Sequence, residues 1–210
     1  MTFFPHILGR RQHTVLKRLG PLARQSGFYL AGGTAIALQL GHRRSLDLDW
    51  FTGSRLEEPL RLADHLTEKN LPFRLKRLDA GTLQGDMSRM RVSFFEYRYP
   101  LLKPLGQLHA FDSQSASLAD LAAMKLSAIA QRGAKKDFVD VYAIGCKVAN
   151  LDQMLKWYQQ KFGVRDVTHL LVSLAYFDDA DREPTPSLIW RVDWRTIKRT
   201  ISEWLRELTG

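Results

Sequence analysis

The sequence has few of the features that mark membrane, secreted or metal-cluster proteins. Of its 210 residues only Cys146 is a cysteine, so no internal disulfide can form, and no Cys/His cluster has the spacing of a zinc site. No apolar run approaches the roughly 18–20 residues that cross a bilayer. The segment Met1–His6 has no basic stretch followed by a long apolar one. We therefore expect a cytoplasmic protein without a membrane segment.

The chain does have enough apolar residues for a core, and an excess of positive charge. Hydrophobic residues make up 45% of the sequence, which excludes disorder as a global description. Lys and Arg number 31 against 22 Asp and Glu, so the formal net charge is +9. This excess suits a polyanionic partner such as nucleic acid, a nucleoside triphosphate or a membrane surface, without choosing among them.

Hydrophobic periodicity divides the chain into a mixed first half and a helical second half. The first half is predicted to form helices over 10–26, 35–40 and 57–69, and strands over 28–31, 45–51, 73–78, 82–87 and 90–97. The second half is predicted to form helices over 118–132, 136–149, 151–162, 165–176 and 193–208, with an acidic, proline-containing loop at 178–186. We therefore predict an α+β fold, with a mixed sheet and flanking helices over residues 1–110 and a helical bundle over residues 111–210.

Two motifs in the first half contain the residue types that bind phosphate and metal. Gly32, Gly33 and Thr34 follow an apolar strand, and Thr34 is expected to cap the next helix. The N–H groups of such a turn and helix start form an anion site. Asp47 and Asp49 alternate with apolar residues, so their carboxylates project from one side of a strand. This pair could hold a hard cation such as Mg²⁺ that also binds substrate phosphates.

Each motif alone is weak, because glycine turns and Asp-x-Asp pairs are common on ordinary surfaces. Their combination favours a functional site, since two carboxylates in an otherwise apolar strand repel each other without a counter-ion. Arg43 and Arg44 lie between the motifs, and their guanidinium groups could clamp phosphate oxygens. His42 beside them is expected to be structural, since no partner for it can be named.

A second group of charged residues lies in the helical half. Lys125 lies on the apolar side of the predicted helix 118–132, so its ammonium needs a carboxylate or a phosphate nearby. In the following helix Asp137 and Asp140 lie three residues apart on one face. Either aspartate could pair with Lys125 as a purely structural ion pair, and spacing alone does not choose between them.

Four segments resemble a known family. They are FYLAGGT (28–34), GHRRSLDLDWF (41–51), LAAMKL (121–126) and RGAKKDFVDVY (132–142). Together they are similar to the motifs of the AbiEii-type nucleotidyltransferase toxins, within the DNA polymerase β-like nucleotidyltransferase superfamily. The first motif is shared by many nucleotidyltransferases, and the later ones narrow the resemblance.

The resemblance implies a metal-dependent enzyme that transfers a nucleoside monophosphate from an NTP to an acceptor hydroxyl and releases pyrophosphate. RNA, in particular a tRNA 3′ end, is the implied acceptor, and the chain would be the toxin of a toxin–antitoxin or phage-defence pair with a cognate antitoxin. The implied roles are triphosphate binding by Gly32, Gly33 and Thr34, binding of Mg²⁺ or Mn²⁺ by Asp47 and Asp49, phosphate neutralisation by Arg43, Arg44 and Lys125, and positioning of Lys125 by Asp137 or Asp140.

Two alternatives stay open. The acceptor could be a small molecule or a protein hydroxyl, or the chain could be a non-catalytic nucleic-acid-binding relative, although such a module has no reason to keep a self-repelling aspartate pair. Enzymes of this superfamily often add a third carboxylate from a neighbouring strand. Asp86 and Glu96 are the candidates, neither is convincing, and Ser93 occupies the middle of that strand. Whether the general base is a third acid or Asp49 is therefore left open.

Overall fold

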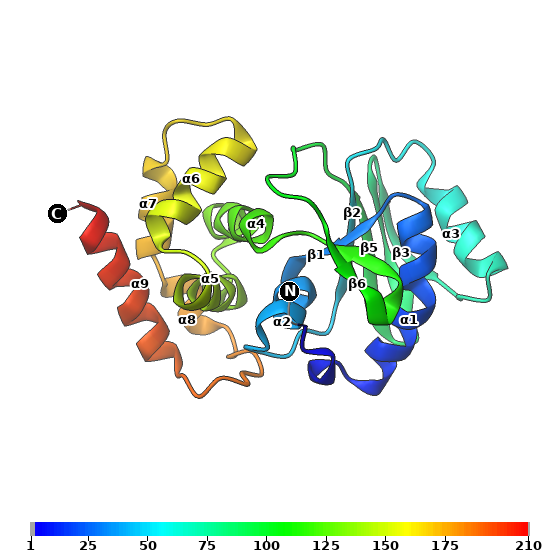
Figure 1. Ribbon diagram of the computed structural model, residues 1–210, viewed down its shortest axis with the longest axis horizontal. Helices are drawn as coiled ribbons and strands as arrows, with labels where there is room; N and C mark the ends of the chain where they lie inside the picture. The colour runs from blue at the N-terminus through cyan, green and yellow to red at the C-terminus, as the bar shows by residue number, and fades with distance from the viewer. Residues whose placement is uncertain (1–2, 210) are drawn as a thin grey trace.

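A computed structural model describes residues 3–209 as a mixed sheet beside a cluster of helices (Figure 1). The strands are β1 (Tyr29–Ala31), β2 (Leu48–Thr52), β3 (Arg74–Asp79), β4 (Thr82–Met87), β5 (Met90–Glu96), β6 (Gly106–Leu108) and β7 (Ser113–Ser115). The helices are α1 (Arg10–Gln25), α2 (Gly32–Leu40), α3 (Pro59–Glu68), α4 (Leu118–Arg132), α5 (Lys135–Lys147), α6 (Leu151–Phe162), α7 (Thr168–Ala175), α8 (Asp178–Arg182) and α9 (Trp194–Thr209), with short 3-10 turns η1 (Pro5–Ile7) and η2 (His109–Phe111). Among these residues no helix has both the length and the apolar composition that crossing a bilayer requires.

The sheet has the strand order β3-β4-β5-β2-β1-β7-β6. The central strand β2 runs antiparallel to β1 and parallel to β5. Its residues alternate as the sequence pattern predicts: Leu48 and Trp50 are buried on one face, while Asp49 and Phe51 are only partly buried on the other. Helices α1 and α3 pack against the sheet on the right of Figure 1, and α4 to α9 gather on the left.

Helices α2 and α4 connect the sheet to the helical cluster. α2 follows β1 directly and contacts both α4 and α5. α4 begins after Ser117, whose hydroxyl accepts a hydrogen bond from the Asp120 N–H, as expected of an N-cap. α4 ends at Gly133, which adopts the left-handed conformation. The helices α2, α4 and α5 therefore form a group in which each contacts the other two.

The predicted boundaries near the glycine turn need two corrections. The strand predicted over 45–51 begins at Leu48, so Asp47 precedes it. β1 pairs with β2 only as far as Asp49, and Leu48 pairs with Val92 of β5 alone, whereas the Asp47 carbonyl oxygen accepts a hydrogen bond from the Thr34 hydroxyl. The second correction concerns Thr34, which is not an N-cap because α2 already begins at Gly32.

Three further differences lie in short polar segments. β6 and β7 were not predicted, and residues 178–182 of the predicted acidic loop form the short helix α8. The helix predicted over 165–176 begins only at Thr168. β7 lies beyond the predicted division at residue 110, yet Ser115 pairs with Leu30 of β1, so the sheet continues to that point. The division into residues 1–110 and 111–210 stays a prediction.

Candidate active site

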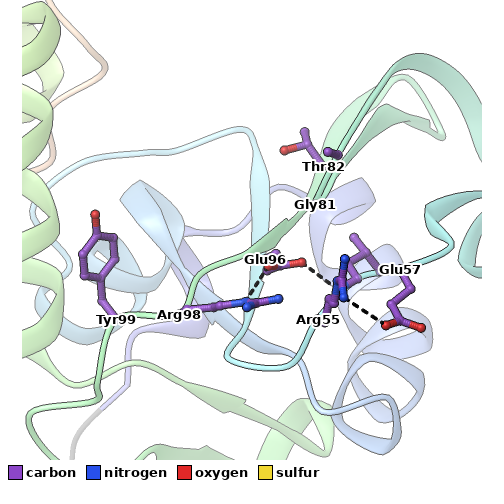
Figure 2. A pocket seen from close by; sticks show the side chains of 9 residues that line it. Arg55, Glu57, Gly81, Thr82, Glu96, Arg98 and Tyr99 are labelled. Carbon is purple, nitrogen blue, oxygen red and sulfur yellow. Dashed lines mark hydrogen bonds and ion pairs between the residues drawn. The ribbon is translucent and has the colours of Figure 1, made fainter.

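One large surface cavity contains arginines whose positive charges are paired with carboxylates. Its volume is about 880 Å³, and it is lined by Arg55, Leu56, Glu57, Ala80, Gly81, Thr82, Glu96, Arg98 and Tyr99 (Figure 2). Both arginines face carboxylates in the same cavity: Arg98 Nε lies 2.7 Å from Glu96 Oε1 and Arg55 Nη1 lies 3.6 Å from Glu57 Oε1. Neither predicted motif reaches this cavity. The second cavity, of about 340 Å³, is the candidate site because residues of both motifs line it.

The glycine turn forms one wall of this smaller cavity. Gly32 has a φ of +67° and begins α2, so the first N–H groups of that helix lie at the turn. A Cβ atom at Gly32 would lie 2.7 Å from Asp49 Oδ2, and one at Gly33 would overlap the Arg43 guanidinium. The positive φ favours glycine at position 32, and at both positions an added Cβ would displace a charged side chain that approaches the backbone closely.

The aspartate pair lies next to the turn. Asp49 is paired with Ala31 of β1 on one side and with Ser93 of β5 on the other, and Asp47 lines the same cavity. Burial and the nearby charge of Asp47 raise the pKa of the Asp49 carboxyl, although a hydrogen bond from Ser93 opposes the shift. The nearby Lys125 and Lys136 offset this effect only in part, and a bound cation would favour the charged form of Asp49 further.

The pair fits a cation that takes its other ligands from a substrate. Within residues 3–209 no group of three or more His, Cys, Asp or Glu side chains is placed to hold a metal ion. Mg²⁺ is commonly bound by only one or two carboxylates together with substrate phosphates and water. The hard oxygen atoms of Asp47 and Asp49 match that requirement.

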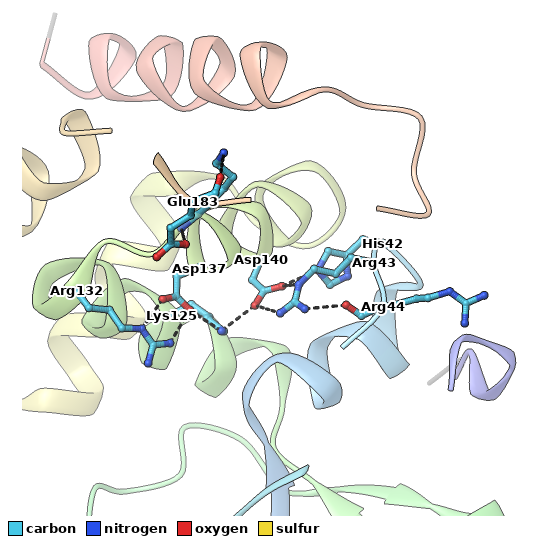
Figure 3. A network of polar contacts seen from close by, with 9 residues as sticks. His42, Arg43, Arg44, Lys125, Arg132, Asp137, Asp140 and Glu183 are labelled. Atoms are coloured by element: carbon cyan, nitrogen blue, oxygen red, sulfur yellow. Dashed lines mark hydrogen bonds and ion pairs between the residues drawn. The ribbon is translucent and has the colours of Figure 1, made fainter. Parts of the chain in front are cut away.

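Lys125 contacts both of the aspartates between which spacing could not choose. Its Nζ lies 2.7 Å from Asp137 Oδ1 and 2.8 Å from Asp140 Oδ2 (Figure 3). Burial alone would lower the pKa of the Lys125 ammonium, but the charges of Asp140 and Asp137 raise it overall, so Lys125 is charged. Arg43 Nε and Nη2 donate to the two oxygens of Asp140 at 2.7 and 2.8 Å.

Two further side chains complete this network. His42 Nε2 lies 2.7 Å from Asp140 Oδ1, and burial lowers the His42 pKa despite that carboxylate, so the ring is neutral and its Nε2–H donates. Arg132 Nε donates to Asp137 Oδ2 at 2.8 Å. Burial would raise the pKa of Asp140, but Arg43 and Lys125 hold it well below its ordinary value. The network thus links His42 and Arg43, which precede β2, to the helices α4 and α5 through ionic and hydrogen-bond contacts.

The cavity also contains cations to which the sequence analysis assigned no role. Arg132 and Lys136 are exposed and line the cavity. Arg91 lines it as well, with its Nη1 4.0 Å from Asp47 Oδ2. A signal was present in the sequence, since Arg132 lies seven residues after Lys125 and therefore on the same side of α4.

Two side chains expected to bind phosphate do not reach the cavity. The Thr34 side chain is buried, and its hydroxyl donates to the carbonyl oxygen of Asp47, which holds the backbone of the aspartate segment against α2. The Arg44 backbone N–H donates to the Ser187 carbonyl oxygen at 2.8 Å, and its side chain extends away from the ionic network in Figure 3. The triphosphate contacts implied for these two side chains therefore do not match their positions.

The two candidates for a third carboxylate are engaged elsewhere. Asp86 Oδ2 lies 2.5 Å from Lys76 Nζ, and Glu96 accepts hydrogen bonds from the Leu56 N–H and from Arg98 in the larger cavity. Neither lines the smaller cavity. The residue directly beside Asp49 on β5 is Ser93.

Comparison with known proteins places the chain in a family. Residues 87–206, more than half of the chain, match the family model described as nucleotidyl transferase AbiEii toxin, type IV TA system. The chain belongs to the AbiEii nucleotidyltransferase toxin family. It is also 34% identical over 207 residues to the uncharacterized protein aq_aa25 of Aquifex aeolicus (strain VF5), covering 94% of this chain and 98% of that protein.

Solved structures confirm the predicted α+β nucleotidyltransferase fold. MenT4, a nucleotidyltransferase toxin from Mycobacterium tuberculosis H37Rv, aligns with a TM-score of 0.58 at 15% identity, covering 95% of this chain and 83% of its own. JHP933 from Helicobacter pylori aligns with a TM-score of 0.57 at 15% identity, covering 98% and 93%. The AbiEii match begins at residue 87, so it includes Lys125, Asp137 and Asp140, whereas the glycine turn and the aspartate pair precede it.

Proposed function

We propose that this AbiEii-family chain transfers a nucleoside monophosphate from an NTP to an acceptor hydroxyl, with Mg²⁺ or Mn²⁺ held by Asp47 and Asp49. The observation that supports this most is a juxtaposition in one cavity of about 340 Å³. A glycine turn that opens a helix lies beside a self-repelling aspartate pair, and the charged Lys125 lies on the facing helix. These are the parts that holding a metal-bound triphosphate requires.

Each residue has a role that follows from its position. The N–H groups at Gly32 and Gly33 bind phosphate oxygens, and Arg43, fixed by Asp140, holds the turn that presents them. Lys125 and Arg132 add positive charge on the facing wall. The bound cation would neutralise triphosphate charge as a Lewis acid. The acceptor hydroxyl releases its proton to solvent as its oxygen bonds to the α-phosphorus, the bond from that phosphorus to the oxygen bridging to the β-phosphate breaks, and pyrophosphate leaves.

We further propose RNA, in particular a tRNA 3′ end, as the acceptor. The net charge of +9 and the exposed Arg132 and Lys136 at the cavity support a polyanionic acceptor over a small molecule or a protein hydroxyl. In this proposal the chain acts as the toxin of a toxin–antitoxin or phage-defence pair and has a cognate antitoxin as its partner.

The substitution Asp49→Asn tests the proposal. Purified wild-type chain is incubated with each labelled NTP, Mg²⁺ and either total RNA or protein, and the position of the label is determined. We expect labelled RNA with the wild type and a loss of roughly a hundredfold or more with Asp49→Asn, because the metal would lose a charged ligand. The variant should fold normally, since burial and Asp47 already disfavour the Asp49 charge.

Asp86→Asn is the matched control, because Asp86 lies in the same sheet on β4, separated from β2 by β5, and outside the cavity, paired with Lys76. It should transfer nucleotide at the wild-type rate. Transfer by Asp49→Asn at that rate would refute the proposed metal site. Label in protein but not in RNA would refute the acceptor assignment while leaving the reaction class intact.

A further inference from the structure

One end of the candidate active-site cavity is aromatic rather than charged. Phe51 follows Asp49 by two residues on β2, so both side chains face the same side of the sheet. Phe95 is paired with Phe51 across β2 and β5, and Tyr97 follows two residues later. The ring centroids of Phe51 and Phe95 lie 5.0 Å apart, and those of Phe51 and Tyr97 lie 5.4 Å apart. All three rings line the cavity and remain partly exposed.

Apolar side chains of α4 line the opposite wall. Leu121 is fully buried, whereas Met124 is partly exposed, and both line the same cavity. Met124 directly precedes Lys125, so the apolar part of the helix adjoins its charged part. A methionine side chain is flexible and polarisable, and it makes favourable contacts with aromatic ligands. The cavity therefore has an aromatic floor, in which the Phe51 and Phe95 rings are tilted by 35° and the Tyr97 ring stands edge-on to Phe51, and an adaptable apolar wall.

The aromatic floor is held in place without a ligand. Lys161 Nζ lies 5.4 Å from the Tyr97 ring centroid, and it also bonds to Asp120 Oδ1 and to the Pro100 carbonyl oxygen, each at 2.8 Å. The Lys161 side chain is fully buried, so this arrangement has little freedom to rearrange. The Tyr99 and Tyr97 ring centroids lie 5.0 Å apart. A surface fixed before binding loses little conformational entropy when a ligand arrives.

We propose that this aromatic pocket, formed by Phe51, Phe95, Tyr97, Leu121 and Met124, stacks a nucleobase during the transfer reaction. The inference rests on the proposed function, because it takes the ligand of the cavity to be a nucleotide. Two residues of strand separate Asp49 from Phe51 by roughly 6.6 Å, which lets one nucleotide place its phosphate at the aspartates and its base on the rings. Stacking on aromatic side chains is favourable for every base. The base belongs either to the NTP or to the terminal nucleotide of the acceptor.

The substitution Phe95→Leu tests the pocket, with Phe95→Tyr as the matched control. Leucine keeps an apolar side chain but removes the ring, whereas tyrosine keeps the ring. Calorimetry measures the Kd of each NTP and of inorganic tripolyphosphate with Mg²⁺, and the transfer assay measures the KM for RNA. If the base comes from the NTP, Phe95→Leu should weaken NTP binding about tenfold and leave tripolyphosphate binding unchanged. If it comes from the acceptor, NTP binding should be unchanged and the KM for RNA should rise about tenfold.

The pocket is refuted if Phe95→Leu changes neither the NTP Kd nor the RNA KM by more than about twofold. It is also refuted if tripolyphosphate binding weakens as much as NTP binding, because the ring would then act on the phosphate end. Met124→Ala provides the second variant should Phe95→Leu not fold, since alanine is favourable in α4 and removes the opposite wall. Calorimetry needs no turnover, so ring-dependent NTP binding without any transfer would support the pocket while refuting the proposed function.

Discussion

Replacing Asp140 by Asn would show how strongly the helices hold the glycine turn. The Asp140 side chain on α5 is fully buried, and it contacts Arg43 at 2.7 and 2.8 Å, His42 at 2.7 Å and Lys125 at 2.8 Å. Asparagine has almost the same shape but lacks the negative charge that these contacts require. Arg43 in turn lies against Gly33, so the loss reaches the candidate active site.

The expected cost is large because two buried cations lose a counter-charge. Removing one partner of a buried ion pair costs about 3–5 kcal/mol, a substantial part of a typical unfolding free energy of about 5–15 kcal/mol. For a domain of this size the melting temperature should fall by roughly 6–20 °C. Asp137→Asn is the matched comparison. This substitution should lower the free energy of unfolding by less, because the Arg132 side chain is 55% exposed and can be solvated by water instead. Lys125 also retains its ion pair with Asp140.

Urea unfolding at pH 7 measures both variants against the wild type, and similar m-values would show that the unfolded states are comparable. We expect the unfolding free energy to decrease in the order wild type, Asp137→Asn, Asp140→Asn. A cost for Asp140→Asn below about 1 kcal/mol, or a greater cost for Asp137→Asn, would show that the buried network does not hold these elements together.

Two further perturbations test the same region. In Gly33→Ala the new Cβ would overlap the Arg43 guanidinium, which is held by Asp140. The free energy of unfolding should therefore fall by about 1–3 kcal/mol, and calorimetry should show weaker NTP binding. Unchanged NTP binding would contradict the close approach of Arg43 to Gly33. The pKa of His42 is lowered in the folded chain. Below about pH 6.5 the unfolded chain therefore binds a proton at His42 that the folded chain does not bind. The stabilisation by the neutral ring is fully present above that pH and is lost as the pH falls. The advantage of the wild type over His42→Gln in unfolding free energy should therefore shrink by up to roughly 1.4 kcal/mol per pH unit between pH 6.5 and 5, and an advantage independent of pH would refute a neutral buried ring.

The long elements could be predicted because their periodicity is local. The alternation around Asp49 indicated β2, and Ser117 with Gly133 marked the two ends of α4. The segments β6 and β7 could not be predicted, because they lack the apolar residues that indicated the equally short β1: β6 has only Leu108, and β7 is entirely polar. β7 is a strand only because Ser115 finds Leu30 of β1 beside it, which is a long-range contact.

The same distinction applies to the candidate site. The glycine turn and the aspartate pair are local motifs, and the structure brings Gly32 and Asp49 into close contact. The partner of His42 lies 98 residues away, so no local pattern indicates it. The choice posed by spacing between Asp137 and Asp140 has no single answer, because Lys125 lies between the two and contacts both.

The charge around the cavity explains why a cation and a triphosphate would bind together. The five cationic side chains that line it are Arg43, Arg91, Lys125, Arg132 and Lys136. Against them stand Asp47 and Asp49 in the cavity and Asp137 and Asp140 directly behind it, so the formal balance is only one positive charge. Such a nearly neutral surface attracts a triphosphate weakly. A divalent cation at Asp47 and Asp49 would add two charges on the wall where repulsion is greatest, so cation and triphosphate each improve the site for the other.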